Sequence, residues 1–228
     1  MTGGIIETPM AFVLSTIYGI VGNYAVTIVI FTVIIRLILF PLYSAQMRSS
    51  QQMMEIQPLV KEIQAKYAGK PQEMNEKMQE LYQEYKINPA MGCLPLLIQL
   101  PIIWGLFSLL RNPLKFIDVE SNSDMVLAVH ESFFWIPDLG QPDMWILPIL
   151  AGLTTFISMK LTMSMSTQAA GGTSMKVMQY FTPVMIVVMG RMVPSGLCLY
   201  WIVGYIFQII QARIMKKMRE NKKKKEEI

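Results

Sequence analysis

The stretch that decides the fold is residues 25–42, AVTIVIFTVIIRLILFPL, an apolar run with one charged side chain, Arg36. A helix of about 20 mostly apolar residues, rising about 1.5 Å per residue, crosses the hydrocarbon layer of a bilayer. The whole chain of 228 residues is 53% hydrophobic and 16% charged, whereas soluble proteins average about 25% charged residues. The sequence therefore predicts an all-α polytopic membrane protein and argues against a soluble enzyme.

Five apolar segments are expected to span the membrane: 25–43, 93–110, 145–165, 175–190 and 197–213. Around them we expect an N-terminal interfacial helix outside (1–24), a cytoplasmic helical hairpin (44–92), an extracytoplasmic loop (111–144), a short cytoplasmic loop (166–174), a short outer loop (191–196) and a basic cytoplasmic tail (214–228). A continuous helix from Met10 to Phe40 would be about 46 Å long, so we expect a break near Gly19, Gly22 and Asn23. A tilted extension of the first span is the alternative.

Lysine and arginine are concentrated in the segments expected on one side of the membrane. Residues 44–92 contain six of them and the tail from Arg213 contains eight. The segments expected on the other side contain only Arg111, Lys115 and Arg191. Because basic loops remain in the cytoplasm, we expect a multi-pass membrane protein with its N-terminus outside and its C-terminus inside.

The hairpin between the first two spans is predicted from two coiled-coil seams. Spacings of three and four residues define a first seam at Met53, Ile56, Val60, Ile63 and Tyr67, and a second at Met74, Met78, Leu81 and Tyr85. Gly69 and Pro71 lie between them and favour a helix stop and a helix start. Methionine-rich surfaces suit varied apolar partners, so the candidate client-receiving residues are Met53, Met54, Met74 and Met78. An ordinary structured loop is the alternative.

Arg36 is a charge within an expected span. Such a side chain at mid-span costs about 2.5 to 3.5 kcal/mol on the insertion scale, so an unpartnered, lipid-facing position is disfavoured. The five expected spans contain no aspartate or glutamate that would neutralise it. Arg36 therefore either snorkels to the cytoplasmic interface or faces a water-filled cavity between helices.

Other polar side chains at helical spacing would line such a cavity. Thr32 precedes Arg36 by four residues and shares its helix face. The third and fifth spans add Thr155, Ser158, Trp201, Tyr205 and Gln208. Together these residues form the candidate substrate-binding groove, which would suit an anionic or polar segment.

The few cysteines and the single histidine argue against a disulfide framework and a metal site. Cys93 and Cys198 are too few for a disulfide framework or a zinc site, and His130 is the single histidine. The chain has no nucleotide-binding motif. We therefore expect no enzymatic activity, no catalytic residue, no metal and no cofactor.

Three stretches together carry a resemblance to a known family: TVIIRLILFPL (32–42), NPAMGCLP (88–95) and LYWIVG (199–204). With the charged hairpin and the basic tail, they resemble the YidC family of membrane protein insertases in its Gram-positive type, which lacks the large periplasmic domain. The order and spacing of these features cover nearly the whole chain.

The resemblance implies five spans around a hydrophilic groove that opens to the cytoplasm and to lipid. Arg36 matches the family's groove arginine, and Thr32 and Trp201 match positions near which clients pass. Some Gram-positive members carry glutamines in the third span, where this chain has Ile157, Ser158 and Met159. The expected function is insertion and folding of client membrane proteins, and a small channel or transporter with the same polar cavity is the alternative.

The expected partners are nascent membrane proteins and lipids, with the ribosome and the Sec translocon as further candidates; no DNA partner is expected, and the chain would function as a monomer. The tail lysines Lys222, Lys223, Lys224 and Lys225 are candidate contacts to ribosomal RNA or to lipid. The alternative for these lysines is an orientation signal alone.

Overall fold

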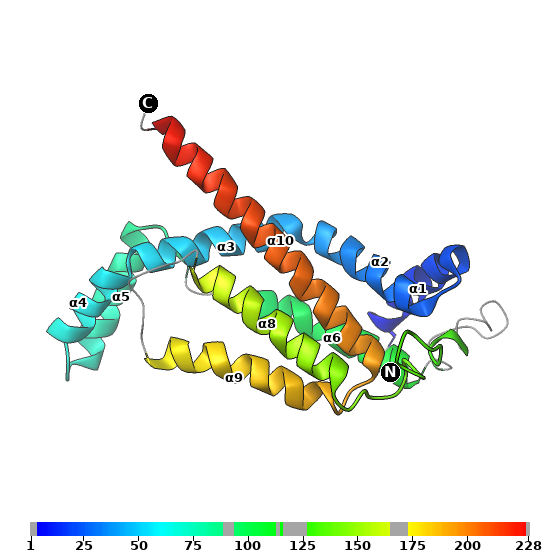
Figure 1. Ribbon diagram of the computed structural model, residues 1–228. Helices are drawn as coiled ribbons and strands as arrows, with labels where there is room; N and C mark the ends of the chain where they lie inside the picture. Colours follow the sequence, from blue (N-terminus) through cyan, green and yellow to red (C-terminus); the bar gives the residue numbers. More distant parts are fainter. Residues whose placement is uncertain (1–3, 89–93, 113–114, 116–126, 165–172, 227–228) are drawn as a thin grey trace.

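The part of the chain that the structure describes is built from helices (Figure 1). This computed structural model describes residues 4–88, 94–112, 115, 127–164 and 173–226. Their helices are α1 (Glu7–Val21), α2 (Tyr24–Ile38), α3 (Phe40–Glu55), α4 (Gln57–Lys66), α5 (Pro71–Glu84), α6 (Leu94–Arg111), α8 (Ile146–Ser164), α9 (Thr173–Gly190) and α10 (Ser195–Glu226). Among these residues, extended pairing is limited to an isolated bridge between Phe133 and Ile136. The all-α fold class is therefore confirmed.

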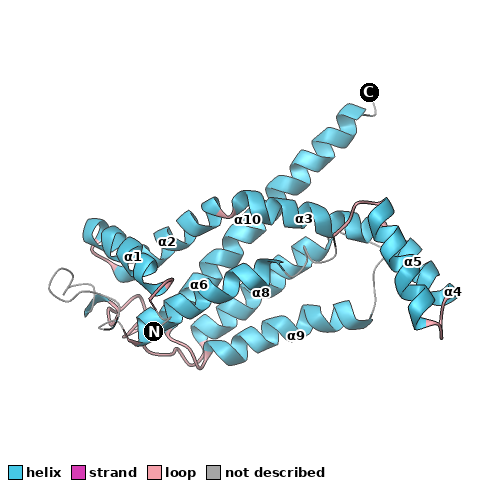
Figure 2. Cartoon of the chain, turned by 180° about the vertical axis from the view of Figure 1, so that it is seen from behind, coloured by secondary structure: helices cyan, strands magenta, loops and turns pink. Residues whose placement is uncertain are grey.

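The helices form an elongated bundle with two different ends. Helix α8 packs against α9 and α10, helix α10 also packs against α2, and α1 packs against α2 and α6. The pair α4 and α5 lies at one end of the molecule, and residues 127–145 lie at the opposite end (Figure 1). Figure 2 shows the reverse face, with α6, which packs against α10, toward the viewer.

The chain turns between α1 and α2 at Gly22 and Asn23. Gly22 has a φ of 64°, the left-handed conformation that ends many helices and that glycine adopts without steric cost. The Asn23 side chain then accepts a hydrogen bond from the Val26 N–H at 3.0 Å and caps the start of α2. This local chemistry separates the N-terminal apolar helix from the run that begins at residue 25.

A second break falls inside the run that decides the fold. Helix α2 ends at Ile38 and α3 begins at Phe40, with a bend of 57° between the two helices. Pro41 explains the bend, because proline lacks a backbone N–H and its ring clashes with the carbonyl four residues earlier. Residues 25–43 are therefore shared between two helices that point in different directions.

By length and composition, one described helix is able to cross a bilayer alone, Ser195–Met218, with 24 residues. The bent pair Tyr24–Ile38 and Phe40–Met53 passes the same test when it is taken together. The other apolar helices are α1 with 15 residues, α6 and α9 with 18 residues each, and α8 with 19 residues. The lengths of α6, α8 and α9 lie at the short end of the range of about 17 to 25 residues that spans a bilayer.

Residues 127–145, which we call the end loop, join the starts of several helices. Glu131 accepts a hydrogen bond from the backbone N–H of Tyr24 at the start of α2, at 2.7 Å. The carbonyl of Gln141 accepts one from the N–H of Ser195 at the start of α10, at 2.9 Å. The first amides of a helix have no intrahelical acceptor, so the end loop supplies acceptors that the helices lack.

Asp143 of the end loop accepts hydrogen bonds from backbone N–H groups at the start of α8. Its carboxylate accepts hydrogen bonds from the backbone N–H groups of Trp145 at 3.0 Å and Leu147 at 2.9 Å, and from the Trp135 indole N–H at 3.2 Å. Partial burial raises the pKa of the Asp143 carboxyl, but the hydrogen bonds to its charged form outweigh burial and hold the pKa below its ordinary value. Asp143 is therefore a charged cap at the positive end of the α8 dipole.

The main apolar core closes the same end of the bundle. It is formed by α1, α2, α6, the start of α10 and the end loop. Its most deeply buried side chains include Leu14, Ile28, Leu106, Val129, Leu139 and Leu197. Buried polar side chains also lie at this end, among them Glu7, Thr27 and Ser195.

Replacing Asp143 by Ala should lower the free energy of unfolding by about 1 kcal/mol, the usual loss when an N-cap is removed. Because the folded pKa is depressed, this stabilisation is complete above the unfolded pKa and is lost as the pH falls through the folded pKa. Denaturant unfolding of the detergent-solubilised protein at neutral and acid pH measures both effects.

The control for this prediction is Asp143→Asn, which keeps one acceptor oxygen but removes the titrating charge. At neutral pH it should retain more stability than Asp143→Ala, and it should lose the acid-dependent part of the stability. If Asp143→Asn keeps the acid dependence of the native chain, another group is responsible.

Candidate functional site

Arg36 lies near the end of α2, about one turn before the bend, and only 7% of its surface is exposed. Its guanidinium carbon lies 5.2 Å from the centre of the Tyr43 ring on α3, within the range of a cation–π contact. On the other side it faces α10, where an added Cβ at Gly204 would meet the Arg36 Nη2 at 2.5 Å. The guanidinium is therefore held between an aromatic ring and the bare backbone of a glycine.

The buried charge of Arg36 has no carboxylate partner among the described residues, and its Nε makes no hydrogen bond there. Tyr200 and Tyr205 on α10 are close enough to interact electrostatically with it. A guanidinium carries five N–H donors and cannot lose its proton in a protein. The site thus offers a positive charge with unused hydrogen-bonding capacity in a largely buried setting.

The polar side chains predicted on the third and fifth spans meet across the α8–α10 interface. Ser158, 2% exposed, donates a hydrogen bond to Gln208 at 2.9 Å. Thr155, fully buried, donates to the Ala151 carbonyl at 2.7 Å and is also hydrogen-bonded to Tyr205. The structure therefore joins these predicted residues in two pairs that hold α8 against α10.

Two predicted groove residues are buried in the packing. Thr32 is fully buried and donates its hydroxyl to the carbonyl of Ile28 at 2.6 Å, within its own helix. Trp201 is 5% exposed and belongs to the main apolar core. In this conformation neither side chain presents a free polar surface, and only rearrangement of the helices would bring Trp201 against another chain.

The sequence reasoning missed a second polar network beside Arg36. Gln99 on α6 donates a hydrogen bond to the Tyr200 hydroxyl at 2.7 Å and accepts one from the Tyr43 hydroxyl at 3.4 Å. Gln211 on α10 donates to the Ser44 hydroxyl of α3 at 3.2 Å. Two signals were available: Gln99 lies in an otherwise apolar segment, and Gln211 follows Gln208 by three residues.

The pair α4 and α5 has its own small core. It buries Ile56, Val60, Leu81 and Ile87, and it includes the partly buried side chains of Met53, Leu59, Ile63, Met78 and Tyr82. Two of the candidate client-receiving methionines, Met53 and Met78, are therefore partly used inside the pair. Met74 is also half-buried, and the side chain of Met54 lies outside the described part.

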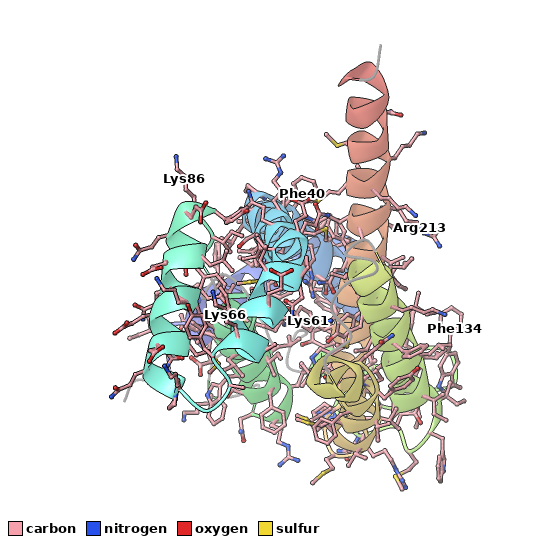
Figure 3. All side chains as sticks on the ribbon, turned by 90° about the vertical axis from the view of Figure 1, so that its left-hand side faces the viewer. Phe40, Lys61, Lys66, Lys86, Phe134 and Arg213 are labelled. Atoms are coloured by element: carbon pink, nitrogen blue, oxygen red, sulfur yellow. The ribbon has the colours of Figure 1, made fainter. Side chains whose placement is uncertain are left out.

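The outer surface of this pair is charged. Lys61, Lys66 and Lys86 project from it (Figure 3). Exposed ion pairs join Lys70 to Glu73 and Lys77 to Glu80, and such pairs add little stability. The second basic region of the chain is the C-terminal part of α10, which extends beyond the bundle to Glu226 (Figure 1). The side chains of Lys222, Lys223, Lys224 and Lys225 lie outside the described part.

The described residues contain no group of three or more His, Cys, Asp or Glu side chains suited to a metal ion. What the arrangement around Arg36 offers chemically is electrostatic: a positive charge beside tyrosine and glutamine side chains from α3, α6 and α10. It fits the reversible binding of a polar or anionic group.

Comparisons with known proteins agree with this architecture. A family model described as the 60Kd inner membrane protein matches residues 16–224. The membrane protein insertase YidC 2 of Listeria innocua is 41% identical over 226 residues, which cover 96% of this chain and 73% of that protein. The membrane protein insertase YidC of Fusobacterium nucleatum is 40% identical over 210 residues, which cover 91% of this chain and 94% of that protein.

A solved structure is also similar. The crystal structure of an active YidC insertase with its first transmembrane domain resolved superposes with a TM-score of 0.67 and 29% sequence identity. The match covers 90% of this chain and 45% of that chain, so this chain spans less than half the length of the matched structure. The resemblance noted from the sequence is confirmed: the chain belongs to the 60Kd inner membrane protein family, the family of the YidC insertases.

Proposed function

We propose that this chain inserts client proteins into the bacterial plasma membrane and helps them to fold there. The observation that carries the proposal is the nearly buried Arg36, whose Nε makes no hydrogen bond and which has no carboxylate partner among the described residues. The relatives named as membrane protein insertases support it. A charge held inside a membrane protein at a cost in free energy is by default a functional group.

Within this proposal the chain crosses the membrane five times, with its N-terminus outside and its C-terminus in the cytoplasm. The crossings are α2 with the start of α3, α6, α8, α9 and α10. The distribution of lysine and arginine supports this orientation, with the α4–α5 pair and the basic tail in the cytoplasm. The end loop then lies on the outer side, where the apolar core closes the bundle.

The mechanism proceeds without covalent chemistry. The α4–α5 pair receives an emerging apolar segment, and the polar tail of that segment enters the groove beside Arg36. Acidic residues in the tail are attracted by the guanidinium, while the apolar segment moves along the bundle into lipid. Partition of the client into lipid drives the step, together with a membrane potential worth about 2.3 kcal/mol per charge per 100 mV.

The short helices assist this movement. Helices α6, α8 and α9 have 18 or 19 residues, slightly fewer than the about 20 of a crossing of normal thickness. A locally thinned bilayer shortens the distance over which the polar tail must cross. Candidate partners beyond the clients are lipids, the Sec translocon and the ribosome. The ribosome would be bound through the basic end of α10. One copy of the chain contains the whole proposed groove, so the chain would act as a monomer.

Replacing Arg36 by Ala should abolish insertion of a short single-span client with an acidic tail, whereas Arg36→Lys should retain most of it. The proposed contact needs a positive charge, and no described carboxylate contacts both arms of the guanidinium. Protease protection of the client tail, measured in a depletion strain rescued with each variant, gives the result.

A matched control for Arg36→Ala is Lys160→Ala, which removes an exposed positive charge from α8. This variant should insert the same client normally, since Lys160 lies away from the buried site. Normal insertion by Arg36→Ala would contradict the electrostatic role of Arg36.

A separate prediction concerns Gly204→Ala. Its Cβ would meet the Arg36 guanidinium at 2.5 Å for Nη2 and at 3.2 Å for Cζ. Only the mobile end of the arginine must move, so the fold should keep its stability or gain up to about 1 kcal/mol from the loss of a helical glycine. Insertion of the acidic-tail client should nevertheless fall, because the guanidinium is displaced from its position.

The test for this prediction is a double-mutant cycle. In an Arg36→Lys background, Gly204→Ala should cause no further loss of insertion, because the slender lysine has no planar group against α10. Gly19→Ala, where an added Cβ meets nothing within 4 Å, is the control and should insert normally. An equal loss in both backgrounds would show that Gly204 acts independently of Arg36.

A further inference from the structure

The end loop contains a tight turn with two aromatic residues at its tip. The backbone N–H of Phe133 donates to the Ile136 carbonyl at 2.8 Å, and the N–H of Ile136 donates to the Phe133 carbonyl at 2.9 Å. Phe134 and Trp135 lie between these two bonds. Phe134 has a φ of 53°, a left-handed conformation that is unfavourable for a bulky side chain.

The turn places its aromatic rings outside the protein. Phe134 is 84% exposed and Trp135 is 49% exposed, while Ile136 beside them is 3% exposed. The ring of Phe134 contacts that of Phe133 edge to face, with centroids 4.5 Å apart. A large aromatic residue is therefore held in a strained backbone conformation and is directed away from the core, which is the reverse of what stability alone would favour.

Hydrogen bonding fixes the turn at the level of the α8 N-terminus. The indole N–H of Trp135 donates to the same Asp143 carboxylate that caps α8, at 3.2 Å. Next to it, Trp145 is 61% exposed, and the guanidinium of Arg191 lies 4.4 Å from its ring. Tryptophan rings, which have one polar edge, are enriched at membrane–water interfaces, and here an arginine lies beside them.

The exposed rings continue into an apolar stripe along α8. Ile146, Ile149 and Leu153 follow at spacings of three and four residues and are 47%, 51% and 52% exposed. In an integral membrane protein of this family, such a stripe on a spanning helix faces lipid acyl chains. The turn therefore adjoins the lipid-facing surface at the point where the helix leaves the hydrocarbon layer.

We propose that the Phe134–Trp135 turn is a membrane anchor that enters the interfacial layer of the lipid leaflet at the end of the bundle opposite α4 and α5. Its ligand is the lipid surface: the Phe134 ring enters the acyl boundary, and the Trp135 indole lies at headgroup level. Because Glu131, Gln141 and Asp143 of the same loop bind the starts of α2, α10 and α8, the anchor sets the depth of these helix ends. The proposal rests on membrane location and not on insertase activity.

Native Trp135 is a suitable fluorescent reporter of depth. In a Trp104→Phe, Trp145→Phe variant, the remaining tryptophans are Trp135 and the buried Trp201. Subtracting the signal of the same variant with Trp135→Phe isolates Trp135. The protein is reconstituted into phosphatidylcholine vesicles whose acyl chains carry bromine either near the headgroup or near the methyl end, and iodide is the aqueous quencher.

We expect shallow bromines to quench Trp135 several-fold more strongly than deep bromines, with little quenching by iodide. Phe134→Ser should then expose Trp135 to iodide, whereas Leu127→Ser should not. Leu127 is the matched control, because it is an apolar residue of the same loop, 73% exposed, and lies outside the turn.

Three results would overturn the anchor. Iodide quenching as complete as that of tryptophanamide would place the turn in water. Protection from bromine and iodide together would mean that protein covers the turn, in this chain or in a second copy. Equal effects of Phe134→Ser and Leu127→Ser would remove the specific role of the turn.

Discussion

The guanidinium of Arg36 is the constraint around which the bundle is arranged. It carries a permanent charge on a helix whose other residues suit lipid, so it has to be enclosed by protein or water. The structure encloses it with the Tyr43 ring on one side and the backbone at Gly204 on the other. This arrangement requires the bend at Leu39, which brings Tyr43 back toward α2, and a glycine on α10 at the point of contact. Among the described residues, no carboxylate forms an ion pair with the guanidinium.

The two ends of the bundle are held together by different interactions. At one end, apolar packing and the acceptors of the end loop fix the starts of α2, α8 and α10. Toward the other end, amide and hydroxyl side chains from α3, α6, α8 and α10 meet in pairs, as in Ser158 with Gln208 and Gln99 with Tyr200. The proposed groove would then hold a polar segment beside the polar pairs without opening a path through the apolar end. This division supports the function proposed for the chain.

Sequence reasoning reached the fold class because hydropathy and helical spacing are local properties. It also singled out Arg36 and the polar positions on the third and fifth spans, since a charge or an amide in an apolar run is visible by inspection. It did not find the network of Tyr43, Gln99 and Tyr200, whose members lie on three helices and are joined only by packing. It assigned Met53 and Met78 both to the packing seams of the hairpin and to a client-receiving surface, and the structure has them partly buried in the α4–α5 core.

The sequence by itself determined that the chain is helical and membrane-bound, that a charge lies within an apolar run, and that a helix ends near Gly22. These features follow from the chemistry of neighbouring residues. Only the tertiary structure decided that Arg36 lies against Gly204, that Trp201 is in the core and that Trp135 is bound to the cap of α8. The reason is geometric: such contacts depend on the rotation and crossing of helices distant in sequence, which no local spacing specifies.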